Sequence, residues 1–249
     1  MQFISRVLLT FLFLFVGASQ AQTVDEIIQK NIEACGGSAN WQAVESMKIE
    51  GNYTSFSISR PFKIIRKRPD LYRFEHFVSS KPVTRTYDGE VAWWINPWFG
   101  SMDPLRTPSP DSLTTLREKN FESIFWNYQD HGRNVELLAN TDVDGVDCYA
   151  LKVTLENGDA ETWYLDTDSY LAVKMEGDFY DFGAKVNLVM YIDDYREVNG
   201  ILLPHFLEQE FGTFHRTFEL SSIEINTEVD ESIFAMPTPP ASETETKNE

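Results

Sequence analysis

The chain has 249 residues, of which 42% are hydrophobic, and its 39 acidic and 21 basic side chains give a formal net charge of −18. A charge of this sign repels nucleic acids and anionic membrane surfaces, so it argues against a nucleic-acid-binding protein. The length is sufficient for one sizeable domain with its own hydrophobic core.

The first 21 residues have the pattern of a secretory signal peptide. Arg6 precedes an apolar run over residues 7–16, and Ser19-Gln20-Ala21 offers a small-x-small cleavage site. The apolar run is about half as long as a membrane-spanning helix, and an uncleaved anchor helix is the alternative interpretation. We therefore expect an exported chain that is cleaved near Ala21. Export makes a disulfide between Cys35 and Cys148 chemically possible without requiring it.

A helix is predicted directly after this segment. Thr23 can cap it, and Glu26 completes a capping box. Gly36 and Gly37 end it, and a second short helix can follow from Ser38. Between these signals, apolar residues recur at helical spacing: Val24, Ile27, Ile28 and Ile32.

From Lys48 onward the sequence changes to short segments that are rich in β-branched and aromatic residues. Turn signals such as Pro69-Asp70 and Asp88-Gly89 separate them, and seven more segments of this kind follow over residues 133–226. Strands in series with tight turns predict a mainly β fold, an incomplete antiparallel β-barrel (half-barrel) of about 11 strands. We expect one domain over residues 22–238, followed by a polar, proline-rich, disordered tail at 239–249.

Residues 101–132 interrupt this strand pattern. Ser109-Pro110-Asp111 has the pattern of a helix start. Helical spacing also relates four aromatic and aliphatic residues: Phe121, Ile124, Phe125 and Tyr128. We expect one or two short helices here, which would cover the sheet as a lid.

Motifs of catalysis and metal binding are scarce. The sequence contains no G-x-S-x-G, H-E-x-x-H or P-loop pattern. Residues 140–145 (NTDVDG) begin like a calcium loop, but Leu151 occupies the position of the bidentate glutamate, which favours a hairpin turn. We expect no metal and no cofactor, although a secreted hydrolase with paired carboxylates stays open as a minor hypothesis. The histidines show no spacing typical of a ligand set: His76, His131, His205 and His215.

Aromatic residues are concentrated in residues 93–99 (WWINPWF). Because neighbours in a strand point to opposite faces, Trp93 would lie on a fully apolar face with Val91 and Ile95. Pro97 ends the strand and leads directly to the insertion. Two interpretations are open. Either these aromatics fill a core, or they line a cavity beneath the lid that suits an acyl chain.

An arginine run precedes Pro69. In an extended strand Arg66 and Arg68 share a face with Phe62 and Ile64. A guanidinium on an apolar face is costly unless its donors are satisfied. Backbone carbonyls at the ends of lid helices could satisfy them, or Arg68 could instead pair with a carboxylate or reach solvent.

Four features occur in a fixed order along residues 23–237. They are Lys67-Arg68-Pro69-Asp70-Leu71-Tyr72; Tyr87-Asp88-Gly89 followed by Trp93-Trp94-Ile95-Asn96-Pro97; the helical insertion; and Glu231-Ser232-Ile233-Phe234 with Met236-Pro237. In this order they resemble the outer-membrane lipoprotein carrier and lipoprotein-sorting (LolA-like) family. The chain is longer than the typical carrier, and residues 191–206 are more similar to sorting-protein-like relatives, so the resemblance leaves the cargo open.

The resemblance implies a non-enzymatic periplasmic half-barrel that shields the acyl chains of a lipoprotein or lipid between two membranes. It also implies inner-membrane donor and outer-membrane acceptor proteins as partners, and a monomer. Arg68 would latch the lid through hydrogen bonds to its backbone. The alternative is a structural or protein-binding cell-envelope module with a filled barrel. The candidate ligand-binding residues are Arg68, Tyr72, Phe74, Trp93, Trp98, Phe99, Phe121, Phe125 and Trp126.

Overall fold

The computed structural model describes residues 22–99, 102–181 and 183–238. The predicted signal peptide and C-terminal tail lie outside these residues. No helix in the described ranges has both the length and the apolar composition needed to cross a membrane.

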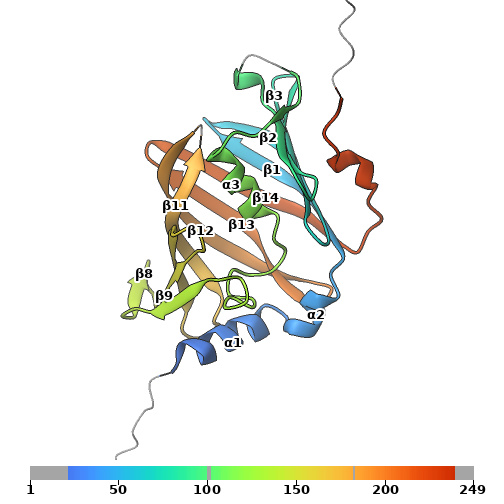
Figure 1. The fold of residues 1–249 in the computed structure, drawn as a ribbon. Coiled ribbons are helices and arrows are strands. Elements are labelled where there is room, and N and C mark those ends of the chain that lie inside the picture. The colour runs from blue at the N-terminus through green and yellow to red at the C-terminus, as the bar shows by residue number, and fades with distance from the viewer. Residues whose placement is uncertain (1–21, 100–101, 182, 239–249) are drawn as a thin grey trace, which may run out of the picture.

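One antiparallel sheet of 14 strands dominates the molecule, and it curves around the helical insertion (Figure 1). Its strands are β1 (Ser46–Ser55), β2 (Ile58–Lys67), β3 (Leu71–Val78), β4 (Lys81–Tyr87), β5 (Ala92–Ile95), β6 (Leu105–Arg106), β7 (Asn134–Leu137), β8 (Thr141–Val143), β9 (Val146–Thr154), β10 (Ala160–Asp166), β11 (Ala172–Asp181), β12 (Ala184–Val198), β13 (Ile201–Phe211) and β14 (Phe214–Ile225).

The strand order explains how the sheet forms an open half-barrel. It runs β6-β5-β4-β3-β2-β1-β14-β13-β12-β11-β10-β9-β7, with β8 paired to β9 at one side. The first and last long strands, β1 and β14, therefore pair at the centre of the sheet, and its two ends stay unpaired with each other in the described part of the chain. The predicted mainly β, antiparallel, open architecture is confirmed. The strand count exceeds about 11 partly because β6 and β8 are too short to show a period-two pattern.

The N-terminal helices close one end of the half-barrel (Figure 1). Helix α1 (Val24–Ala34) has the predicted capping box between Thr23 and Glu26. Its Ile27 and Ile28 are buried against the strands in one core cluster. Helix α2 (Ser38–Gln42) follows and buries Trp41.

The insertion contains a single α-helix, α3 (Asp111–Glu118), which begins where the sequence predicts. Residues 119–132 form turns and irregular structure, so the helix expected from the spacing of Phe121, Ile124, Phe125 and Tyr128 is absent. The physical reason is that these side chains go to different places. Phe121 packs near α2 and Phe125 near α1, and Asn127 has a positive φ of 44°, which ends any helical run.

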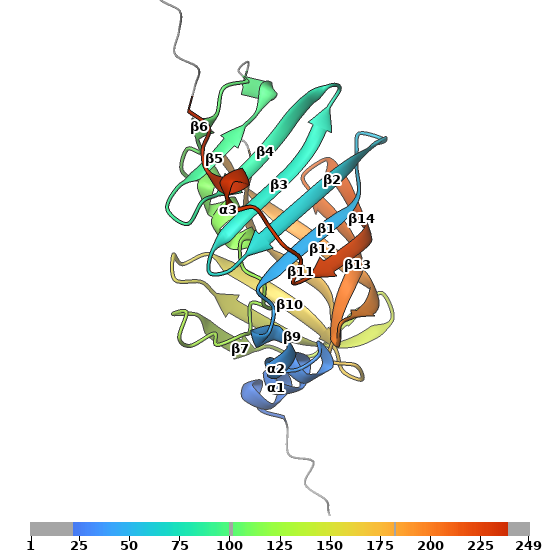
Figure 2. The same ribbon diagram turned by 90° about the vertical axis from the view of Figure 1, so that its right-hand side faces the viewer.

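A 3-10 helix, η2 (Glu231–Phe234), packs on the outer face of β3 (Figure 2). We call this outer surface of the sheet the convex face, and the surface that α3 covers the concave face. Cys35 and Cys148 are free thiols, and burial raises the pKa of Cys35 to about 11. The structure therefore has no disulfide between them.

Candidate functional site

A cavity of about 400 Å³ lies between the concave face and the insertion. Its volume falls within the range of small-molecule sites in proteins. Its wall is mainly apolar, and side chains from α3, the loop after it and nine strands line it. The apolar lining residues are Met47, Ile49, Phe62, Ile64, Tyr72, Phe74, Phe121, Ile124, Leu155, Trp163, Met175, Phe179, Leu188, Met190, Leu203, Pro204, Leu207, Phe218, Leu220 and Ile223.

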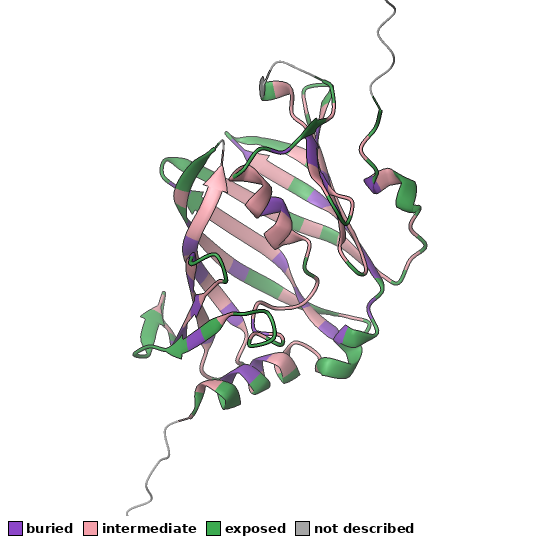
Figure 3. Ribbon diagram, viewed as in Figure 1, coloured by how far each residue is buried: buried purple, intermediate pink, exposed green. Residues whose placement is uncertain are grey.

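The pairing register places these side chains together. Ile49, Ile64, Phe74 and Arg85 lie directly opposite one another on β1 to β4, and residues opposite each other share a face of the sheet. Much of the sheet is coloured as half-buried in Figure 3. Several apolar residues that line the cavity belong to this class, because they border the cavity rather than packed protein. They include Ile64, Trp163, Met190, Leu207, Phe218, Leu220 and Ile223.

Helix α3 is tied to β11, on one side of the cavity. The hydroxyl of Thr114 donates to the carbonyl of Tyr180 at 2.9 Å, and Arg117 donates to the carbonyl of Asp178 at 2.6 Å. Arg117 also forms an ion pair with the buried carboxylate of Glu161. These bonds hold the helix at the side of the sheet that the later strands form.

The same helix is tied to β2, β3 and β4 on the other side of the cavity. Arg66 Nε donates to the carbonyl of Glu118 at 2.8 Å, which satisfies an otherwise free carbonyl at the helix end. The carboxylate of Glu118 accepts from Tyr72 Oη at 2.6 Å and lies 2.9 Å from Arg85. The insertion therefore bridges two distant parts of the sheet over the cavity.

Burial and charge set the protonation of this network. Burial, with the nearby Glu118 carboxylate, raises the pKa of Tyr72 well above its usual value, so the phenol stays protonated and donates. Burial opposes the charge of Arg85, but Glu118, Tyr72 and Asp181 together outweigh it and raise the pKa of this guanidinium. Arg85 also lies over the ring of Phe74, 4.8 Å from its centroid.

Arg68 lies at the rim of the insertion. Its guanidinium donates to the carbonyls of Trp41, at 3.0 Å, and Val44, and it forms an ion pair with the carboxylate of Glu122. It also lies over the ring of Phe121, 5.1 Å from its centroid. Arg68 thus connects the end of α2 to a side chain of the insertion. Its backbone bonds go to α2 and the turn after it, whereas the backbone of α3 is held by Arg66.

Five of the other predicted residues lie at the cavity or in the packed core beside it. Tyr72, Phe74 and Phe121 line the cavity. Phe125 is fully buried in the core beside α1, and Trp126 packs against the core cluster that contains Trp41. Neither of these two residues borders the cavity.

The aromatic cluster of residues 93–99 does not border the cavity as far as its described side chains show. Trp93 is fully buried on the convex face, where Nε1 donates to the carbonyl of Phe234 at 2.8 Å. Its neighbour Trp94 pairs with the cavity-lining Arg85, so Trp94 rather than Trp93 faces inward. Trp98 is 62% exposed. The side chain of Phe99 is not described.

Sequence reasoning missed several lining residues, above all Trp163. In β10, Glu161, Trp163 and Leu165 alternate with partly exposed residues. Trp163 Nε1 donates to Glu161 at 2.7 Å. The sequence of β10 has a period-two pattern, but because Glu161 is charged, the inward face of the strand does not read as apolar.

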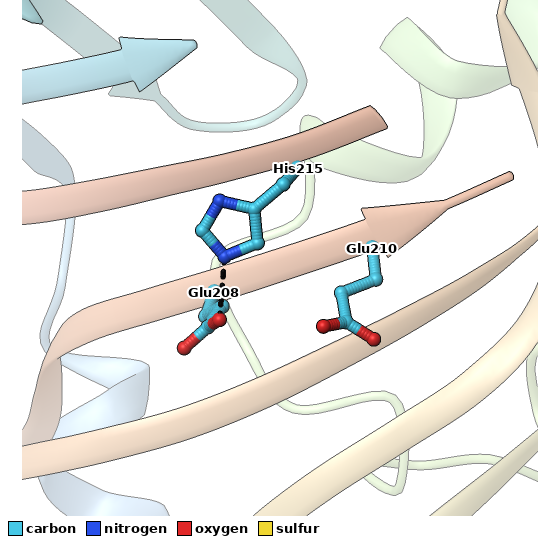
Figure 4. Close-up of side chains that lie close together, drawn as sticks. All are labelled: Glu208, Glu210 and His215. Carbon is cyan, nitrogen blue, oxygen red and sulfur yellow. Dashed lines mark hydrogen bonds and ion pairs between the residues drawn. The ribbon is translucent and has the colours of Figure 1, made fainter. Parts of the chain in front are cut away.

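A second group of polar residues lies on the convex face, on the hairpin of β13 and β14 (Figure 4). One ligand atom each from Glu208, Glu210 and His215 lies within 4.8 Å of the others, and His215 Nε2 donates to Glu208 at 2.5 Å. Sequence spacing could not show this group, because cross-strand pairing brings Glu210 opposite His215. Glu210 and His215 are exposed and Glu208 is half-buried, and exposed acidic groups of this kind are common in proteins without a bound ion.

Comparisons with solved structures identify the fold. A DUF1329 family protein from Desulfovibrio piger ATCC 29098 matches with a TM-score of 0.61 and 13% identity, over 85% of this chain and 97% of its own. A LolA superfamily protein from Nitrosomonas europaea matches with a TM-score of 0.57 and 14% identity, over 86% and 98%. A domain assigned to outer membrane lipoprotein sorting, from Vibrio parahaemolyticus, gives 0.52 and 15%, over 84% and 94%.

No family model and no curated protein matches the sequence. At these identities the structural matches establish the fold, which is LolA-like, as the sequence resemblance implies.

Proposed function

We propose that this protein is a periplasmic carrier that binds the acyl chains of a lipid or lipoprotein in the cavity under α3. The observation that carries the proposal is the cavity itself, which is about 400 Å³ in volume and lined mainly by aliphatic and aromatic side chains. An acyl chain offers only apolar contacts, and burial of its methylene groups is favourable at about 0.8 kcal/mol each. The LolA-like fold and the signal-peptide pattern support an envelope carrier.

The filled-barrel alternative has less support. A structural module has no need of an apolar interior space, since unfilled volume forfeits packing energy. Helix α3 itself is held at its two sides by polar bonds, which is an arrangement suited to opening. We assign the chain a binding role without catalysis.

Within this proposal, Tyr72, Phe74 and Phe121 are retained as ligand contacts, and Trp163 is added. Arg68 acts indirectly, as a clamp between α2 and the insertion. Membrane-bound donor and acceptor proteins would load and unload the carrier, which would itself be monomeric.

The test fills the cavity by mutation and compares the two faces of one strand. Leu220 lines the cavity, whereas Thr217 on the same strand lies on the convex face, opposite Glu208. Leu220→Trp should weaken binding of a neutral fluorescent acyl probe at least tenfold, and Thr217→Trp should leave it within about twofold. Urea denaturation of both variants checks that they are folded.

A second measurement uses the protein as isolated from the periplasm. Mass spectrometry of organic extracts should find lipid with the wild type and much less with Leu220→Trp. Equal lipid in both preparations, or equal probe affinity in Leu220→Trp and Thr217→Trp, would show that the cavity is not the binding site.

A further inference from the structure

The wall of the cavity is apolar but carries an excess of positive charge. Four arginines line it, against three glutamates, in a chain whose formal net charge is −18. The three glutamates already have partners. Glu118 accepts from Tyr72 and Arg85, Glu161 pairs with Arg117, and Glu122 pairs with Arg68 at the rim. Two lining arginines, Arg66 and Arg133, form no ion pair with any described residue.

Arg66 is the one of these two that lies on a strand of the sheet. It is on β2, directly opposite Met47 and Tyr72, and its guanidinium lies 5.5 Å from the centroid of the Tyr72 ring. Its Nε is used by the carbonyl of Glu118, and that is its one hydrogen bond to a described residue. The two outer nitrogens of the guanidinium are therefore available for another acceptor.

Arg133 has a different setting. It also donates to a backbone carbonyl, that of Ile124, at 2.6 Å. Its neighbours in sequence, His131, Gly132 and Asn134, are exposed, so solvent and counter-ions can compensate its charge. Burial lowers the pKa of both guanidiniums. Arg66, however, lies on the apolar inner face of the sheet, between Met47 and Tyr72 of the neighbouring strands.

We propose that Arg66 binds the anionic head group, a carboxylate or a phosphate, of a lipid whose acyl chain occupies the cavity. The inference rests on the proposed carrier function and names the class of its cargo. A guanidinium binds either anion through two parallel hydrogen bonds, and such charge-assisted bonds strengthen where water is excluded. The carboxylate of the neighbouring Glu118 is already bound to Tyr72 and Arg85. The anionic head group would therefore be the ion-pair partner of Arg66.

The experiment compares ligands that have one chain length and different head groups. Tetradecanoate, tetradecyl phosphate and the neutral tetradecanol would each displace N-phenyl-1-naphthylamine from delipidated protein, at concentrations below micelle formation. The wild type should bind the better of the two anions roughly tenfold more tightly than the alcohol, since a hydrogen bond to a charged group is worth at least one such factor. Whichever anion binds more tightly distinguishes a fatty acid from a phospholipid or phosphorylated lipid as the source.

Two variants on β2 assign the effect. Arg66→Gln keeps a donor for the Glu118 carbonyl and removes the charge, so the preference for anions should fall to within about twofold while alcohol binding is kept. Lys63→Gln is the matched control, because Lys63 lies on the opposite face of the same strand and pairs with Glu50. It should retain the tenfold preference.

Three outcomes would overturn the assignment of Arg66. They are equal binding of alcohol and anions by the wild type, an undiminished preference in Arg66→Gln, or a preference lost instead in Arg133→Gln. In each of these cases acyl binding itself persists. Failure of all three ligands to displace the probe would overturn the carrier function as well.

Discussion

Trp93 and Trp163 lie on opposite faces of the same sheet, and their surroundings differ. Trp93, on the convex face, is completely buried under η2, and its indole N–H donates to the carbonyl of Phe234. Trp163, on the concave face, is only half-buried, because it borders the cavity. The difference teaches that the most buried aromatic residue marks the packed face. The face that borders the cavity carries apolar residues that point inward and are still incompletely covered, such as Trp163.

The largest effect that this comparison predicts is on stability. Trp93→Ala would leave a large cavity on the convex face and remove the bond to Phe234, so we expect a loss of about 3–5 kcal/mol in the free energy of unfolding. Urea denaturation measures it. Probe affinity of the folded fraction should stay within about twofold of wild type, and a large loss of affinity at unchanged stability would contradict the assignment of Trp93 to the packed face.

Much of the fold could be predicted from local sequence signals, because these signals act over a few residues. The capping box of Thr23 and Glu26, the start of α3 at Asp111 and the inward row of Phe62 and Ile64 all follow from spacing. The hairpin turn at Asp144 and Gly145 also forms as expected, between β8 and β9.

The site was less predictable, because long-range pairing decides it. Val91, Trp93 and Ile95 form an apolar row that is equally suited to a cavity wall or to a packed face, and η2, which covers Trp93, comes about 140 residues later in the chain. The bridge from Arg66 to Glu118 joins residues 52 positions apart. No local pattern shows which partner a guanidinium will meet.

The next effect concerns a histidine on the concave face. Burial, with the positive charges of Arg85, Arg60 and Arg216, lowers the pKa of His76 from its ordinary value of 6.5 to about 4. Between these two values the unfolded chain binds a proton that the folded protein does not, so stability falls as the pH is lowered. The difference between these two pKa values corresponds to a loss of roughly 3 kcal/mol in the free energy of unfolding at most.

Urea unfolding of wild type and His76→Gln between pH 7 and pH 4.5 measures this contribution. The variant should lose less stability over this range than the wild type does. His131→Gln, at an exposed position, is the control and should follow the wild-type curve. Parallel curves for all three proteins would place His76 in a more hydrated site than the concave face of the sheet provides.

A smaller effect, on the rate of ligand release, is expected at Arg68, which joins α2 to the insertion. Glu122→Gln removes the ion pair with Arg68 but leaves the bonds from Arg68 to the carbonyls of Trp41 and Val44. If this pair clamps the insertion, its loss at about 1 kcal/mol should speed the release of a pre-loaded acyl probe roughly fivefold. Stopped-flow fluorescence measures the rate. Lys67→Leu breaks the pair between Lys67 and Glu231 outside the cavity, and equal release rates in both variants would remove Arg68 from the gating of the site.

The smallest effect is expected at Trp98, which belongs to the same aromatic cluster as Trp93 but lies outside both packed regions. It is 62% exposed and does not border the cavity, and its backbone bond to Asn96 does not depend on the side chain. Trp98→Ala should therefore change stability by no more than about 0.5 kcal/mol.

Acyl-probe affinity of Trp98→Ala should stay within about twofold of wild type, whereas Trp163→Ala should lower the affinity clearly and abolish most of the tryptophan quenching by the probe. The sequence predicts Trp98 as a ligand contact because it lies next to the insertion in the chain, whereas the structure places Trp163 at the cavity. The two variants show which of these criteria identifies a ligand contact. A loss of affinity in Trp98→Ala as large as that in Trp163→Ala would extend the binding surface beyond the cavity, over the 3-10 turn of Pro97–Phe99.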